Sequence, residues 1–272
     1  MGIGLLGAIM YLTKRGQSGI IILTSVPTYA IVLVAHFNLK LWIQHINPTL
    51  WDDWLWRTDE ALRPLVDGAI AVRLAMDPIV DLDGNFYMIG FIAMFYLTFV
   101  FAWIQKPKGF RELFVAVLIL QILGTIGYIA MPALGPFLFE EGVESMSSAA
   151  QAGMLAFYNN NGEFGIHWLG QEGGRQLTAG LAAMPSLHTG ASFLFLAFAI
   201  RHRMVVLAGL LTPLFIFIAI DAVANRWHYV LDLPIGIFFA WIALQLSAHI
   251  STRRMTPARA EMSHAGSDIR VH

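Results

Sequence analysis

Residues 180–193 read Gly-Leu-Ala-Ala-Met-Pro-Ser-Leu-His-Thr-Gly-Ala-Ser-Phe and open a long apolar run. A second polar stretch, residues 225–232, reads Asn-Arg-Trp-His-Tyr-Val-Leu-Asp and opens the next apolar run but one. Each stretch carries one histidine, His188 in the first and His228 in the second, and the second stretch ends on Asp232. The functional interpretation of the sequence depends on whether these three side chains lie close together in the folded protein.

The composition is that of a membrane protein. Of the 272 residues, 57% are hydrophobic and only 13% are charged, whereas soluble domains carry about 25% charged residues. A net charge of −1 leaves no broad basic surface, which argues against a nucleic-acid partner. The lack of cysteine excludes disulfides, thiolate metal sites and a cysteine nucleophile.

Six apolar runs are each long enough, with their flanking residues, to cross a bilayer. We therefore predict an all-α polytopic membrane protein, one integral membrane domain over residues 1–272 with six transmembrane helices. Its core is expected at about 113–250, followed by a disordered polar tail at 251–272. The runs are 19–37, 86–104, 113–131, 187–200, 205–223 and 229–250, of which the fourth is the shortest.

Three other segments are predicted to lie along the membrane surface or over it. Residues 1–12 are too short to span and are expected to form a short interfacial or partly inserted helix. Residues 38–85 hold four tryptophans and an amphipathic pattern, which is typical of interfacial helices. Residues 132–185 are acidic and rich in glycine, with a turn expected at 159–162, and are predicted to cap the outer face.

The distribution of Lys and Arg predicts the orientation. If Lys14 and Arg15 face the cytoplasm, the inner segments hold 11 basic and 3 acidic residues, and the outer segments hold 6 and 15. Short cytoplasmic loops are enriched in Lys and Arg. Both termini are therefore expected to be cytoplasmic, with the two polar stretches on the extracytoplasmic face.

This topology brings the two histidines to one depth. A short turn at 201–204 joins the fourth and fifth runs, and short connections make antiparallel neighbours. His188 and His228 are then expected to open helices on the same side of the membrane. His228 and Asp232 are four residues apart, which predicts that they share one face of a helix. A carboxylate there can accept the Nδ1–H of His228 and leave Nε2 free as a nucleophile.

His188 is predicted to lie in the first turn of its helix, behind Pro185 and Ser186. Helix N-termini favour anions such as phosphate, and the hydroxyls of Ser186 and Thr189 can donate hydrogen bonds to one. In that arrangement His188 can protonate a leaving oxygen.

Plainer interpretations stay open at this point. The two histidines can be unrelated interfacial residues, and His228 with Asp232 can form a structural ion pair. A His–His–Asp metal site is the third alternative. We predict no metal and no cofactor, because the sequence shows no further ligand near these residues.

At these residues the sequence resembles the type 2 phosphatidic acid phosphatase superfamily. Residues 185–188, Pro-Ser-Leu-His, are similar to its Pro-Ser-Gly-His signature, and His228-x-x-x-Asp232 is similar to the end of its third signature. The variant Met-Pro-Ser-Leu-His-Thr-Gly, with Tyr-x-x-x-Pro-Ala-Leu-Gly-Pro at 128–136, resembles the branch of inositol phosphorylceramide synthases and, further off, sphingomyelin synthases. The resemblance covers about residues 113–250.

The resemblance implies a reaction through a phosphohistidine. It implies that His228 attacks phosphorus, that Asp232 orients His228, and that His188 protonates the leaving alcohol before activating water or an acceptor hydroxyl. Two phosphate-binding features of the superfamily are missing: Ala222 stands in place of an arginine, and the Lys-x6-Arg-Pro signature is absent. These departures favour the synthase-like branch, which transfers a substituted phosphate.

The outer segments offer few cations for a phosphate. We predict that Arg226, close to His228, and Arg175, ten residues before Pro185, bind it, because guanidinium groups suit phosphate geometry. The alternative for each arginine is a lipid-headgroup contact or a salt bridge with the acidic loops. Asp221 is predicted either to recognise an acceptor polyol or to pair with Arg226.

The leading functional prediction is a metal-independent lipid phosphotransferase that moves a phospho-headgroup from a phospholipid donor to a lipid or polyol hydroxyl. The first alternative is a lipid phosphate phosphatase of the same superfamily, acting on phosphatidate or an isoprenyl (di)phosphate. The second is a non-enzymatic membrane scaffold or transporter component. The sequence leaves the donor, the acceptor and the oligomeric state open.

Overall fold

The computed structural model describes residues 16–80 and 86–253. Over these residues the chain forms nine α-helices, two short 3-10 helices and no strand, which confirms the predicted all-α class. In chain order the elements are α2 (Gly16–Ile46), α3 (Asp52–Ala61), α4 (Arg63–Val80), α5 (Phe86–Gln105), α6 (Pro107–Ala130), η1 (Pro136–Leu138), α7 (Ser145–Glu172), η2 (Leu177–Ala179), α8 (Leu187–Arg201), α9 (Val205–Ala224) and α10 (Asp232–Arg253).

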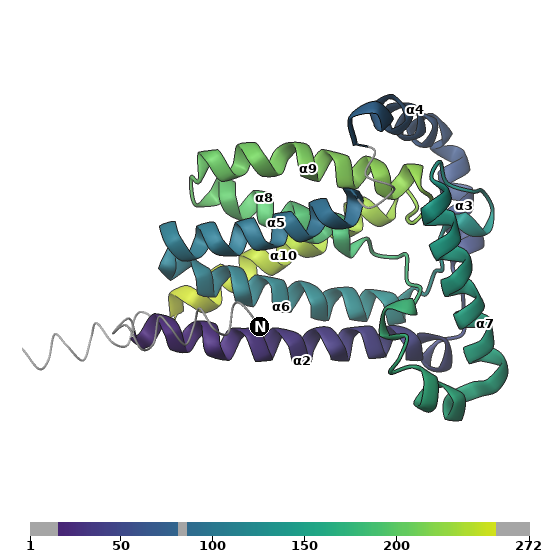
Figure 1. Ribbon diagram of the computed structural model, residues 1–272, viewed down its shortest axis with the longest axis horizontal. Coiled ribbons are helices and arrows are strands. Elements are labelled where there is room, and N and C mark those ends of the chain that lie inside the picture. Colours follow the sequence, from purple (N-terminus) through teal and green to yellow (C-terminus); the bar gives the residue numbers. More distant parts are fainter. Residues whose placement is uncertain (1–15, 81–85, 254–272) are drawn as a thin grey trace, which may run out of the picture.

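Six helices, α2, α5, α6, α8, α9 and α10, run along the length of the molecule and pack into a bundle (Figure 1). The other three, α3, α4 and α7, gather at one end of this bundle, where α7 lies across the helix ends (Figure 1). We call the end that carries α3, α4 and α7 the cap end.

Four helices in the described part of the chain are long and apolar enough to cross a membrane: Phe86–Gln105, Gly109–Ala130, Val205–Ala224 and Asp232–Ser251. They coincide with four of the predicted runs and identify an integral membrane protein. The run at 187–200 forms α8, an apolar helix of 15 residues, and the run at 19–37 lies within α2. The count of six crossings stays a prediction, and residues 1–12 and 254–272 lie outside the described residues.

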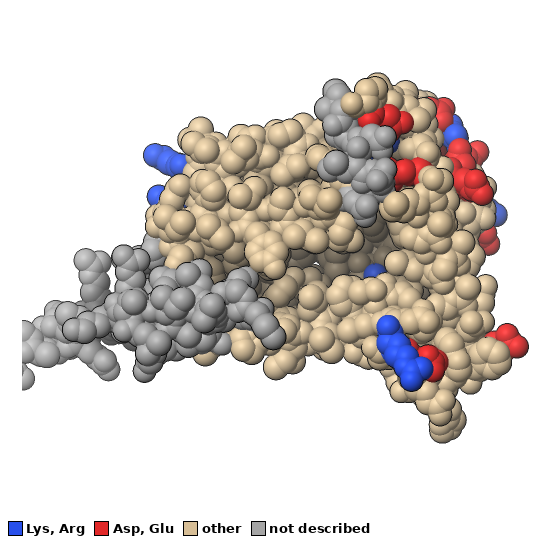
Figure 2. All heavy atoms as spheres, viewed as in Figure 1, with Lys and Arg blue, Asp and Glu red and all other residues tan. Residues whose placement is uncertain are grey.

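Charge is distributed unevenly along the bundle. Figure 2 shows Asp and Glu side chains gathered at the cap end, while the flank of the bundle is almost free of charged side chains. Basic side chains are visible at the opposite end in the same view (Figure 2). This is the asymmetry that the loop charges predict, and the orientation relative to the membrane stays a prediction.

α8 is enclosed by α5, α6, α9 and α10, and its residues Leu194 and Phe198 are fully buried. Its contact with α10 depends on two glycines. A Cβ on Gly236 would lie 2.2 Å from the carbonyl oxygen of Ser186, and a Cβ on Gly190 would lie 2.6 Å from the carbonyl oxygen of Gly236. Only glycine permits this approach, so these positions hold the start of α8 against the start of α10.

The segment 132–185 differs from its prediction, because the turn expected at 159–162 is part of α7. The Asn161 side chain donates a hydrogen bond to the carbonyl oxygen of Leu41 and lies 3.0 Å from Nε2 of His45. These contacts with α2 stabilise a helix at a sequence of weak helix preference. The chain bends instead at Gly165, whose φ is 73°.

Candidate functional site

His228 lies in the irregular segment between α9 and α10. Its Nδ1 lies 2.7 Å from the carbonyl oxygen of Ala183 and 3.5 Å from Oδ2 of Asp232. A carbonyl oxygen only accepts hydrogen bonds, so Nδ1 carries the proton. In the neutral ring, Nε2 then presents a lone pair, which is the tautomer that nucleophilic attack requires.

The predicted helical relation between His228 and Asp232 is wrong, because α10 begins at Asp232 and His228 precedes it. Asp232 turns its carboxylate back and accepts the N–H of Tyr229 at 2.8 Å, much as the acidic residue of a capping box binds the N–H three residues before it. Residues 228–231 fold into a turn, and this turn keeps the carboxylate close to His228.

Two hydrogen bonds join the polar stretches at 180–193 and 225–232. One is the bond from the ring of His228 to the carbonyl oxygen of Ala183. The other runs from the backbone N–H of Ser186 to the backbone oxygen of Asp232, at 3.1 Å. The first stretch thus holds the His228 ring just before α10 begins, and the second holds the backbone of Ser186 just before α8 begins.

His188 lies in the first turn of α8 and faces α5. Its ring centroid is 4.6 Å from that of Phe91 and 5.4 Å from that of Tyr87, and both pairs are nearly perpendicular. His228 and Lys40 both lie within electrostatic range of His188. No described residue forms a hydrogen bond with the His188 ring, which leaves its nitrogens available to a bound molecule.

Ser186 and Thr189 form a fully buried hydroxyl pair at the N-terminus of α8. Ser186 is the N-cap residue, yet its Oγ donates to Oγ1 of Thr189 at 3.0 Å and does not cap the helix. The first N–H groups of α8 therefore have no side-chain cap. Such groups favour an anion.

Two aspartates on α3, which the sequence analysis did not single out, hold the loops of the site. Asp52 accepts the backbone N–H groups of residues 134 and 135 at 3.0 and 2.9 Å, and the hydroxyl of Tyr229 at 2.8 Å. Asp59 accepts the N–H of Val230 at 2.8 Å. Burial raises the pKa of both carboxyl groups, although these hydrogen bonds favour the charged form. The sequence does contain one indication of this shared role: the two aspartates are seven residues apart, a spacing that places them on the same face of a helix.

Arg226, a predicted phosphate-binding residue, is completely buried against α3. Its guanidinium nitrogens lie 3.2 Å from Asp59 and 3.4 Å from Glu140, and its Cζ is 5.3 Å from the ring centre of Trp56. Glu140 also accepts two hydrogen bonds from Arg63, which hold the pKa of Glu140 below its usual range. Arg226 therefore already has two carboxylate partners.

Arg175, the other predicted phosphate-binding arginine, is 77% exposed and pairs with Glu172 at 3.1 Å. No described contact links it to either histidine. Among the described residues, no three His, Asp or Glu side chains are grouped so as to hold a metal ion. Contacts bring together four of the predicted site residues: His228, Asp232, Ser186 and Thr189. His188 lies in the same first turn as Thr189, within electrostatic range of His228.

Asp221 pairs with Arg73 of α4 and not with Arg226. Nε of Arg73 lies 2.7 Å from Asp221, and Nη2 lies 2.6 Å from Glu144. A third salt bridge joins Arg73 to Asp77. Arg73 and Asp221 are 3% and 2% exposed, so this buried cluster fastens α4 to the end of α9.

Replacing Arg73 by methionine is expected to lower the free energy of unfolding by about 3–5 kcal/mol, because a buried carboxylate loses its partner. Chemical denaturation in detergent micelles measures this change. Arg175→Met, which breaks an exposed pair, is expected to change stability by less than about 1 kcal/mol. The double variant Arg73→Met/Asp221→Asn is expected to recover part of the lost free energy of unfolding. Equal losses in Arg73→Met and Arg175→Met would contradict the stabilising role of the Arg73 cluster.

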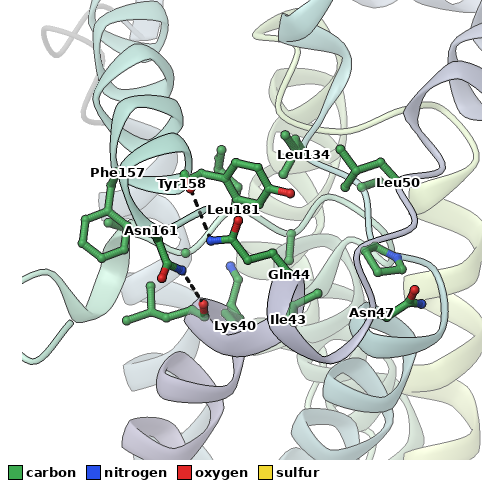
Figure 3. A pocket seen from close by; sticks show the side chains of 16 residues that line it. Lys40, Ile43, Gln44, Asn47, Leu50, Leu134, Phe157, Tyr158, Asn161 and Leu181 are labelled. Atoms are coloured by element: carbon green, nitrogen blue, oxygen red, sulfur yellow. Dashed lines mark hydrogen bonds between the residues drawn. The ribbon is translucent and has the colours of Figure 1, made fainter. Parts of the chain in front are cut away.

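A pocket at the cap end is lined in part by the start of the polar stretch at 180–193. Its lining comes from the last turns of α2, from α7, and from the loops at 132–134 and 179–182 (Figure 3). The second of these loops leads directly into Pro185 and His188. In Figure 3 the amine of Lys40 points from α2 into this pocket. Lys40 follows an apolar run and belongs to no motif, so the sequence alone does not connect α2 with the site.

The sequence model of the PAP2 superfamily matches residues 53–246. No curated protein sequence and no solved structure shows a significant match. The matched region contains both polar stretches and Asp59 of α3, whereas Asp52 and the whole of α2 lie before it. The narrower resemblance to inositol phosphorylceramide and sphingomyelin synthases stays a prediction. Because the match extends over more than two thirds of the residues, the chain belongs to the PAP2 superfamily, whose members are typically phosphatases or phosphotransferases.

Proposed function

We propose that the protein is a membrane lipid phosphotransferase that moves a phospho-headgroup from a phospholipid to a lipid or polyol hydroxyl, as inositol phosphorylceramide synthases do. One observation carries the proposal: the Nδ1–H of His228 is bound by the Ala183 carbonyl beside Asp232, so that Nε2 is free. Superfamily membership supplies the reaction class. The absence of the Lys-x6-Arg-Pro signature favours a substituted phosphate as the transferred group.

In the first half of the proposed reaction, Nε2 of His228 attacks the phosphorus of the donor. A P–N bond forms, and the P–O bond to the donor alcohol breaks. Protonated His188 gives its proton to the leaving oxygen. Asp232 stabilises the positive charge that the ring of His228 acquires.

In the second half, the acceptor hydroxyl gives its proton to His188 while its oxygen attacks phosphorus. The P–N bond breaks, and His228 and His188 return to their starting states. Water in place of the acceptor gives hydrolysis by the same steps. The transferase and the phosphatase therefore differ only in which hydroxyl reaches the phosphohistidine.

We assign Ser186, Thr189 and the uncapped N–H groups of α8 to the oxygens of the phosphoryl group. We assign Arg226 a more distant role, in which it adds positive potential at the phosphoryl group while it stays next to Asp59 and Glu140. Substrate contacts by Arg175 or Asp221 require each to leave its present partner, Glu172 or Arg73.

We place the site on the extracytoplasmic face, with both termini cytoplasmic. This orientation follows from the predicted excess of Lys and Arg in the short loops opposite the cap end.

Purified protein given a headgroup-labelled phospholipid is expected to transfer the label to ceramide, diacylglycerol or inositol. Thin-layer separation of lipid and water-soluble products measures the transfer. Water-soluble phosphate without a new labelled product would replace the transferase by the phosphatase, and no reaction with any donor would favour the non-enzymatic alternative. Full activity in the presence of a chelator is expected, and its loss would contradict the metal-independent mechanism.

A further inference from the structure

We propose that Lys40 of α2 supplies the positive charge that binds the transferred phosphoryl group. The proposal rests on the phosphotransfer function above and adds a residue that none of the sequence motifs contains. Lys40 also lies outside residues 53–246, the part of the chain that matches the PAP2 superfamily.

The site needs a cation that is not already neutralised. Near the cap end, four arginines of the described chain each pair with at least one carboxylate: Arg63, Arg73, Arg175 and Arg226. Their positive charges are offset by these carboxylates within the protein, although the guanidinium nitrogens of Arg226 form no hydrogen bond with a described residue.

Lys40 differs from these arginines, because within the described residues it has neither a carboxylate partner nor a hydrogen bond. Its amine lies over the ring of Tyr128, 5.3 Å from the ring centre. A desolvated ammonium group is costly unless an anion balances it, and an aromatic face compensates for only part of that cost. An anion bound beside the amine would balance the remaining charge.

The position of Lys40 connects it to the catalytic residues. Its charge acts on His188 and on His36, which lies one turn earlier on α2. Tyr128, beneath the amine, is within electrostatic range of Asp232. The amine also points into the pocket (Figure 3), whose lining includes the loop at 179–182 that leads to His188.

The polar stretch at 180–193 leaves room for this side chain. A Cβ on Gly180 would lie 2.8 Å from the Cβ of Lys40. The loop that leads to His188 therefore packs directly on the stem of the lysine. The cation and the general acid are positioned by the same loop.

Lys40→Met is expected to lower kcat/KM for the phospholipid donor about 10- to 100-fold, chiefly through KM, because one charge-assisted hydrogen bond to phosphate is lost. Lys40→Arg keeps the charge and is expected to restore kcat/KM to within a few-fold of the wild type. Arg57→Met, which removes an exposed charge from α3, controls for the loss of a positive charge and is expected to leave KM unchanged.

A binding measurement separates this proposal from the proposed activity. Inorganic phosphate and orthovanadate are expected to raise the Tm of the wild type, Lys40→Arg and Arg57→Met in detergent, but not that of Lys40→Met. This result would support the anion site even if no lipid product were found. An equal rise in Lys40→Met, or an unchanged KM, would overturn the role of Lys40. Lys40→Gln provides the same test if the methionine variant does not fold.

Discussion

Replacing His228 by asparagine is expected to abolish turnover, by at least about 10⁴-fold in kcat, while leaving the fold intact. The amide nitrogen of asparagine lies where Nδ1 of histidine lies, so it can still donate to the carbonyl oxygen of Ala183. What the variant lacks is Nε2, the atom proposed to attack phosphorus. Initial rates with a labelled phospholipid measure the loss, and the Tm in detergent reports the fold.

His228→Ala is the matched comparison, because it removes both the nucleophile and the hydrogen bond to Ala183. We expect it to be equally inactive and also less stable than the asparagine variant. A labelled, acid-labile phosphoprotein should form in the wild type and in neither variant. Turnover by His228→Asn within tenfold of the wild type would remove His228 as the nucleophile.

Replacing Gly236 by alanine is expected to disrupt the site from a distance. The new Cβ would lie 2.2 Å from the carbonyl oxygen of Ser186, so α10 and the start of α8 must separate. Overpacking of this kind costs about 1–3 kcal/mol and sometimes more. Because the shift also moves His188 away from His228, activity should fall more steeply than stability, by about 10²-fold or more.

Gly209→Ala in α9 is the control for this substitution. No atom lies within 4 Å of a Cβ at that position, and alanine is preferred over glycine inside a helix by about 1 kcal/mol. We therefore expect unchanged or slightly higher stability and normal activity. Denaturation in micelles and donor turnover, measured on both variants, test the pair. Normal activity of Gly236→Ala would show that the close contact between α8 and α10 does not position the histidines.

Apolar length alone predicted α5, α6, α9 and α10, because the thickness of the hydrocarbon layer dictates how many apolar residues a crossing needs. It did not reveal where α10 begins. Residues 229–231 are Tyr-Val-Leu and extend the apolar run toward His228. The start of the helix is set instead by the carboxylate of Asp232 turning back to the N–H of Tyr229, which composition does not show.

The meeting of the two polar stretches was predicted from the short turn between α8 and α9. The roles of Asp52 and Lys40 were not, because they depend on contacts between distant parts of the chain. Asp52 and Tyr229 are 177 residues apart yet share a hydrogen bond. Pairings of this kind leave no periodic pattern in a single sequence. The helix α7 could not be predicted at Asn161 for the same reason, because contacts with α2 stabilise it there.

The two hydrogen bonds that join the polar stretches also determine how late in synthesis the site can be assembled. The ring of His228 and the backbone oxygen of Asp232 are synthesised after α2 to α9, so neither bond can form before the segment that leads into α10 has been made. Until α10 is in place beside α8, the proposed acid, His188, does not have the proposed nucleophile, His228, beside it. The proposed reaction therefore requires α10 as well as α8, and a chain that has inserted only its earlier helices is expected to be inactive toward phospholipids.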